Sequence, residues 1–70
     1  MSELARLLGQ NVRRIRKERK MSQDSLALKS EIDRSYMGRI ERGEVNITVE
    51  KLYRLAQALE CSPASLLPSA

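Results

Sequence analysis

Residues 22–43, SQDSLALKSEIDRSYMGRIERG, decide the fold of this 70-residue chain. Their pattern predicts two short helices, over residues 23–29 and 34–42, joined by a tight turn. Ser22 suits the start of the first helix, because its hydroxyl can accept a hydrogen bond from a free amide of the first turn. Asp33 suits the start of the second helix for the same reason, and its negative charge complements the positive end of that helix.

The second of these helices has two chemically different faces. Tyr36, Met37 and Ile40 recur at helical spacing and are expected to face the core. The opposite face carries Arg34, Ser35, Gly38, Arg39 and Arg42. A helix with long cationic donors on its outer face has the size and charge to enter a DNA major groove. The alternative interpretation is a solvated basic surface.

Five short motifs connect this stretch to a known family: SQ at 22–23, LA at 26–27, DRSY at 33–36, IERG at 40–43 and NIT at 46–48. Together they resemble the helix-turn-helix of the lambda-repressor-like family, also called the xenobiotic-response-element family. The resemblance extends over about residues 8–67. DRSY followed by IERG and NIT also resembles the small controller proteins of restriction–modification systems. Glu31 replaces the glycine that the family has in the turn, which implies a left-handed backbone there.

The resemblance implies roles for individual residues. Arg34, Ser35 and Arg39 would read bases, since Arg can donate two hydrogen bonds to guanine and Ser can pair with several bases. The residues implied to contact phosphates are Gln23, Tyr36, Arg42 and Asn46. Tyr36 could equally be a half-buried packing residue. Arg16 and Glu41 match a family pair that ties the first helix to the third, which is a structural role.

The rest of the chain predicts three more helices. The first covers residues 3–20, with an apolar stripe of Leu4, Leu8, Val12 and Ile15. Basic residues crowd its second half, where they either complement the helix terminus or contact phosphates. Thr48 can cap a fourth helix, and Ser62-Pro63 can start a short fifth one over residues 63–67. We therefore expect an all-α, compact five-helix bundle that forms a single helix-turn-helix domain over residues 1–70.

Composition narrows the class of function. The net charge is +4, and residues 1–42 carry eleven of the 13 Lys and Arg but only six of the nine Asp and Glu. Such uneven basic charge indicates either a polyanion binder or a solvated basic surface. The chain has no His and one cysteine, Cys61, so no catalytic constellation, metal-ligand spacing or internal disulfide can be drawn from it. We expect no enzyme activity, cofactor, metal or small-molecule ligand.

Two further expectations concern Cys61 and the location of the protein. Cys61 is interpreted as a small buried hydrophobe, with redox sensing as the alternative. No apolar run is long enough for a signal peptide or a membrane span. We therefore expect a cytoplasmic, nucleoid-associated protein of bacterial or phage origin with no membrane partner.

The expected function is transcriptional regulation through double-stranded DNA. A homodimer would place one copy of the third helix in each of two neighbouring major-groove segments of a pseudo-palindromic operator. The dimer interface is expected in the C-terminal third, at Leu59, Leu66 and Leu67; the alternative is that Leu66 and Leu67 both close a monomeric core. Because the chain ends after the fifth helix, we expect no effector domain, which suits an autoregulating controller of restriction–modification genes or a small phage-type repressor. The alternative function is an antitoxin-like protein-interaction module, which would commonly need an added segment.

Overall fold

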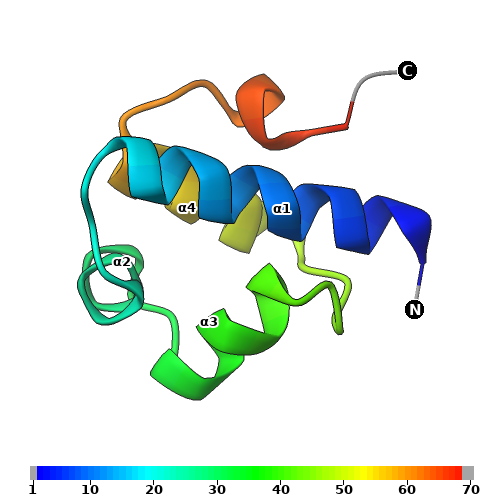
Figure 1. Ribbon diagram of the computed structural model, residues 1–70, viewed down its shortest axis with the longest axis horizontal. Helices are drawn as coiled ribbons and strands as arrows, with labels where there is room; N and C mark the ends of the chain where they lie inside the picture. The colour runs from blue at the N-terminus through cyan, green and yellow to red at the C-terminus, as the bar shows by residue number, and fades with distance from the viewer. Residues whose placement is uncertain (1, 69–70) are drawn as a thin grey trace.

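The computed structural model describes residues 2–68, all of whose regular elements are helical (Figure 1). These elements are α1 (Glu3–Glu18), α2 (Gln23–Ser30), α3 (Arg34–Glu41), α4 (Val49–Leu59) and the 3-10 turn η1 (Pro63–Leu66). The all-α class and the helix-turn-helix of α2 and α3 are as predicted. The prediction of five α-helices is wrong, because residues 63–66 form a 3-10 turn. A segment of four residues is too short for an α-helix to repeat its own hydrogen-bond pattern.

Side-chain caps start the helices where the sequence predicts them. Ser22 Oγ accepts from the Ser25 amide at 3.0 Å, and Thr48 Oγ1 accepts from the Lys51 amide at 3.1 Å. The predicted caps Asp33 and Ser62 also accept amide hydrogen bonds from the turns that follow them. Ser2, which was not predicted, caps α1 in the same way. Each cap satisfies an amide that has no partner within its own helix.

Left-handed residues end several of the helices. Glu31 has φ 57° and ψ 41°, which confirms the conformation implied by the missing glycine. Gly43 has φ 76° just past α3. Lys20 has φ 58°, so α1 ends at Glu18 and does not reach residue 20 as predicted. Likewise, α3 ends at Glu41, one residue before the predicted end.

Replacing Glu31 with glycine is expected to leave stability unchanged or to raise it by up to about 1 kcal/mol. A left-handed residue with a Cβ costs about 1–2 kcal/mol, and glycine removes that cost while loosening the unfolded chain. Thermal melts of Glu31→Gly and of the control Glu31→Ala, which loses the charge but keeps the Cβ, will separate the effect of removing the Cβ from that of removing the charge. A Glu31→Gly protein clearly less stable than Glu31→Ala would contradict this explanation.

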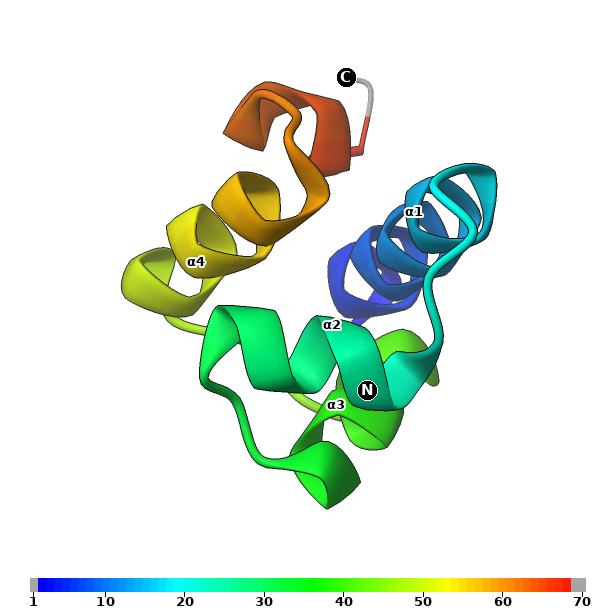
Figure 2. The ribbon, with the colours of Figure 1, turned by 90° about the vertical axis from the view of Figure 1, so that its left-hand side faces the viewer.

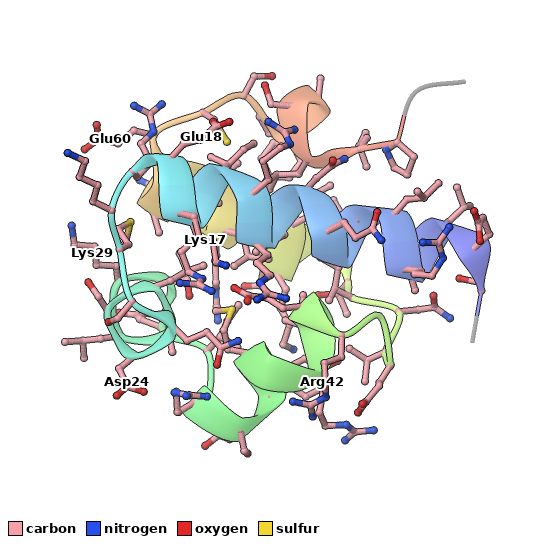
Figure 3. The ribbon with its side chains drawn as sticks, viewed as in Figure 1. Lys17, Glu18, Asp24, Lys29, Arg42 and Glu60 are labelled. Carbon is pink, nitrogen blue, oxygen red and sulfur yellow. The ribbon has the colours of Figure 1, made fainter. Side chains whose placement is uncertain are left out.

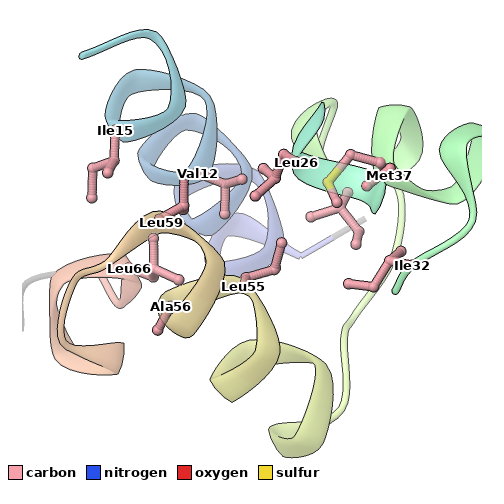
Figure 4. Close-up of a cluster of buried hydrophobic side chains, with 11 residues drawn as sticks. Val12, Ile15, Leu26, Ile32, Met37, Leu55, Ala56, Leu59 and Leu66 are labelled. Carbon is pink, nitrogen blue, oxygen red and sulfur yellow. The ribbon is translucent and has the colours of Figure 1, made fainter. Parts of the chain in front are cut away.

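The hydrophobic core fills the space between α1, α4 and the helix-turn-helix. Figure 2 shows η1 above and α2 below the space between α1 and α4. Figure 4 shows the cluster of buried side chains, which consists of Val12, Ile15, Leu26, Ala27, Ile32, Met37, Ile40, Leu55, Ala56, Leu59 and Leu66. Leu26, Met37 and Ile40 come from the inner faces of α2 and α3, as predicted. The core thus fixes the orientation of α3 from behind and leaves its opposite face outward.

The predicted stripe on α1 is wrong at its first residue. Leu4 is 66% exposed, whereas Ala5 is buried. Ala5 lies seven residues before Val12, which is almost two full turns of 3.6 residues, whereas Leu4 lies eight residues before it. The inner face of α1 therefore passes through Ala5, and Leu4 is rotated toward solvent.

Two glycines let α1 contact the end of α3 at backbone distance. A Cβ on Gly9 would lie 2.4 Å from the carbonyl oxygen of Ile40 and 2.8 Å from that of Glu41. A Cβ on Gly43 would lie 2.6 Å from the α-carbon of Arg6. Side chains at either glycine would separate the two segments. The position of α3 therefore depends on a close approach to α1.

Candidate nucleic-acid interface

The outer face of α3 is a cationic surface, which we call the arginine face and define as Arg34, Ser35, Gly38, Arg39 and Arg42. The arginine side chains are 52–60% exposed. Gly38 is buried beneath two of them, since a Cβ there would lie 3.1 Å from Nη1 of Arg42 and 3.8 Å from Nη1 of Arg34. Figure 3 shows Arg42 on the side of α3 that faces away from α1 and α4. The helix therefore presents its guanidinium groups outward, as the sequence predicts.

Each arginine of the arginine face is paired with a carboxylate that sequence reasoning did not include. Nε of Arg34 donates to Oδ1 of Asp24, in the first turn of α2. Glu44, which follows α3, pairs with both Arg42 and Arg39. The sequence shows that Glu44 is close to Arg42 along the chain, but the pairing itself depends on how the backbone turns at the end of α3. Nothing in the sequence signals the pairing of Asp24, because it depends on how α2 crosses α3.

Ser35, a predicted base reader, has its hydroxyl engaged within the helix cap. Its Oγ donates to Oδ2 of Asp33. This hydrogen bond and those from the Tyr36 and Ser35 amides hold the pKa of Asp33 below its ordinary value. While its hydroxyl donates to Asp33, Ser35 can offer a base only the acceptor lone pairs of Oγ, so its role in base reading stays a prediction.

The predicted phosphate contacts lie around this surface but already have partners. Gln23 Nε2 donates to Oε1 of Glu41 at 2.9 Å and carries a second N–H that a phosphate could use. Tyr36 is half-buried, with Nζ of Lys51 5.4 Å from the centre of its ring, so packing accounts for part of its role. Asn46 is exposed and accepts a hydrogen bond from Ser2 Oγ at 3.1 Å. With Arg42, these residues stay predicted phosphate contacts.

A buried ion pair holds the helix-turn-helix against α1. Arg16 Nε donates to Oε2 of Glu41 at 2.7 Å, and its Nη2 donates to Oε1 at 3.1 Å. The two side chains are only 11% and 3% exposed. Arg16 Nη1 also donates to the Met21 carbonyl at 2.8 Å, and Gln23 shares the Glu41 carboxylate. The pair implied by the resemblance is thus present, and it joins α1, the start of α2 and α3.

Two of the three predicted dimer contacts are not available to a partner. Leu59 and Leu66 are 1% and 0% exposed, so the assignment of these two residues to an interface is wrong. The reason is that η1 folds back onto α1 and α4, where Asn11 Nδ2 donates to the Leu66 carbonyl at 3.0 Å. Leu67 is 47% exposed and stays a candidate.

Residues 2–68 give little support for metal binding, for a reactive thiol or for a membrane-spanning helix. No group of three or more His, Cys, Asp or Glu residues there could hold a metal ion. Cys61 is half-buried, and burial raises the pKa of its thiol while the charge of Arg19 acts in the opposite direction. A thiol held protonated by burial is a poor nucleophile. None of the helices described is both long and apolar enough to cross a membrane.

Comparison with known proteins agrees with this geometry. The helix-turn-helix family profile matches residues 12–66, so the chain belongs to the lambda-repressor-like helix-turn-helix family of transcriptional regulators. It is similar to the control protein C.SmaI from Serratia marcescens, with 40% identity over 65 residues that cover 93% of this chain and 77% of C.SmaI. An uncharacterised helix-turn-helix-type transcriptional regulator, y4dJ of Sinorhizobium fredii, is 37% identical over 65 residues, which cover 93% of this chain and 84% of y4dJ. The crystal structure of the restriction–modification controller protein C.AhdI from Aeromonas hydrophila superposes with a TM-score of 0.88 at 38% identity, covering 90% of this chain and 96% of C.AhdI.

Proposed function

We propose that this protein regulates transcription by binding a specific double-stranded DNA sequence, with α3 in the major groove. The observation that carries the proposal is the arginine face, which is held outward by a buried ion pair and a packed core behind it. The groove of B-DNA is about 12 Å wide and admits one α-helix. An all-helical domain whose exposed helix face is cationic has the shape and charge to fit it.

Within the proposal, two sets of contacts have separate roles. Contacts from Gln23, Tyr36, Arg42 and Asn46 to phosphates supply affinity and fix the orientation of the domain on the duplex. Arg34, Ser35 and Arg39 reach base edges and supply sequence preference, because only base edges differ between sequences. The free amides at the start of α2 would add to the phosphate contact of Gln23.

Replacing Arg34 or Arg39 with alanine is expected to weaken binding to the preferred duplex by about 1–3 kcal/mol and to relax preference at one base pair, as expected for loss of a bidentate base contact. Titration of each variant with the preferred duplex and with single-base variants of it measures both effects. Arg14→Ala is the control, since it removes an equally exposed positive charge from α1. Arginine variants that keep the full preference would show that α3 is not the reading helix.

We further propose that the protein acts as a homodimer on a pseudo-palindromic operator. Two copies of α3 would enter major-groove segments about 34–36 Å apart. The binding free energies of two weak half-site contacts would then add. The C-terminal third carries little of the positive charge, so two copies can approach there without strong repulsion. Leu67 is one of the large apolar residues exposed in that region, with Val49 and Tyr53, and it lines a hollow together with Leu7, Asn11, Arg14 and Pro68.

Leu67→Glu is expected to shift the dimer toward monomer, because a self-complementary contact loses its apolar side chain in both copies at once and takes in a charge from each. Sedimentation of the wild type and the variant over a range of concentrations measures the shift. Leu28→Glu, which charges an 80% exposed leucine on α2, is the matched control and should leave association unchanged. A wild type that stays monomeric at high concentration would contradict the proposed dimer.

The relatives favour a particular regulatory role. Both C.SmaI and C.AhdI are named as control or controller proteins, and C.AhdI belongs to restriction–modification. We therefore propose that this protein is an autoregulating controller of restriction–modification genes. Acting on bacterial DNA would place it on the nucleoid in the cytoplasm. Footprinting of the purified protein on the DNA upstream of its own gene would test autoregulation directly. A protected site in that region is the expected result.

A further inference from the structure

The carboxylate of Glu44, just past the end of α3, forms ion pairs with two arginines of the arginine face. Oε2 of Glu44 accepts from Nε of Arg42 at 2.7 Å, and its Oε1 lies 3.7 Å from Nε of Arg39. The hydrogen bond from Arg42 holds the pKa of Glu44 below its ordinary value, so the carboxylate is charged at neutral pH. The two guanidinium groups thus share one negative charge.

The backbone fixes Glu44 in this position. Its amide donates to the Arg39 carbonyl at 2.9 Å, and the Gly43 amide donates to the Ile40 carbonyl at 3.0 Å. These two hydrogen bonds, with Gly43 left-handed, form the Schellman motif that ends α3. Glu44 therefore stays beside the arginine face through the helix end itself, and its position does not depend on the ion pair alone.

We propose that Glu44 raises the sequence selectivity of this protein by penalising DNA contacts in which Arg39 meets a phosphate instead of a base, an inference that rests on the proposed DNA-binding function. The carboxylate approaches Arg39 from its Nε edge. A guanidinium has five N–H donors, so the N–H groups on its far edge can still meet a base while Nε lies beside the carboxylate. Arg39 can donate to guanine O6 and N7 without leaving Glu44.

Contacts to phosphates and contacts to bases differ in the charge of the acceptor. A phosphate is an anion, so it repels a carboxylate that shares the same arginine. Guanine O6 and N7 accept the same hydrogen bonds without a net charge. Non-specific binding consists essentially of phosphate contacts, so Glu44 weakens binding to random duplex more than binding to the preferred duplex.

Glu44→Gln tests this inference, because it keeps the size and polarity of the side chain and removes the charge. Affinities are measured for the preferred duplex and for a random duplex of the same length, over a series of salt concentrations. The matched control is Glu18→Gln, which removes one negative charge from α1 on the side of the molecule opposite Arg42 (Figure 3). Circular dichroism checks that both variants keep the native helicity.

We expect Glu44→Gln to raise affinity for random duplex by about three- to tenfold at low salt, the range set by a screened surface charge. Affinity for the preferred duplex should rise less, so that selectivity falls, whereas Glu18→Gln should change both affinities slightly and equally. Equal factors on both duplexes for Glu44→Gln would overturn the role of Glu44 while leaving selective binding by the wild type intact. A wild type without any sequence preference would overturn the proposed function itself.

Discussion

Arg16→Met and Glu41→Gln are each expected to lower the free energy of unfolding by about 3–5 kcal/mol, the usual cost of stranding one charge of a buried pair. The pair is bidentate and the Glu41 side chain is only 3% exposed. Small domains are stable by about 5–15 kcal/mol, so this loss would be a large share of the total. Thermal and denaturant melts of both variants measure it.

The double variant Arg16→Met/Glu41→Gln distinguishes the ion pair from simple loss of packing. Because both charges are then absent, its destabilisation should be clearly smaller than the sum of the single effects. An i,i+4 surface pair, Arg54–Glu50 at 3.1 Å, supplies the control, since its single variants should each cost less than about 1 kcal/mol. Strictly additive effects at Arg16 and Glu41 would show that the two side chains do not stabilise each other.

Gly9→Ala is expected to destabilise the protein by about 1–3 kcal/mol or more, the range found when atoms are added to a well-packed contact. The new Cβ would lie 2.4 Å from the carbonyl oxygen of Ile40, so the backbones of α1 and α3 would have to separate. Alanine gains up to about 1 kcal/mol of helix propensity over glycine, which offsets only part of the cost of a clash with backbone atoms. Melts measure the net effect.

Replacing Gly38 with alanine is a matched control, because the expected change in stability has the opposite sign. A Cβ there would meet Nη1 of Arg42 at 3.1 Å, which is the far end of a flexible side chain. Gly38→Ala should therefore raise stability by about 0.5–1 kcal/mol through helix propensity. A Gly9→Ala protein as stable as Gly38→Ala would show that α1 does not depend on its close approach to α3.

Features governed by local chemistry could be predicted from the sequence. Caps such as Ser22 and Asp33 act on amides within a few residues, and the inner faces of α2 and α3 follow from helical periodicity. The prediction for α1 was wrong at Leu4 because Leu4 and Ala5 are both apolar and adjacent in sequence. Which of the two is buried depends on the elements that pack against α1. In the sequence Gly9 is visible only as a residue of low helix propensity, since a helix crossing leaves no local signal.

The candidate site divides in the same way. The outward placement of Arg34, Arg39 and Arg42 follows from spacing on one helix. Their pairing with Asp24 and Glu44 needs the three-dimensional position of α2 and of the helix end. The burial of Leu66 and the exposure of Leu67 likewise depend on how η1 folds back, which the run of two leucines does not specify.

The central claim is that α3 of this protein reads a DNA sequence, and selection of bound duplexes from a random pool tests it most directly. The wild type is predicted to enrich inverted half-sites whose centres lie about 34–36 Å apart. This spacing is one helical turn, so two copies of α3 can enter successive major grooves on the same face of the duplex. The Arg34→Ala/Arg39→Ala double variant should lose most of that enrichment. A wild-type pool indistinguishable from the input, or a double variant that enriches the same sequence equally well, would contradict the claim.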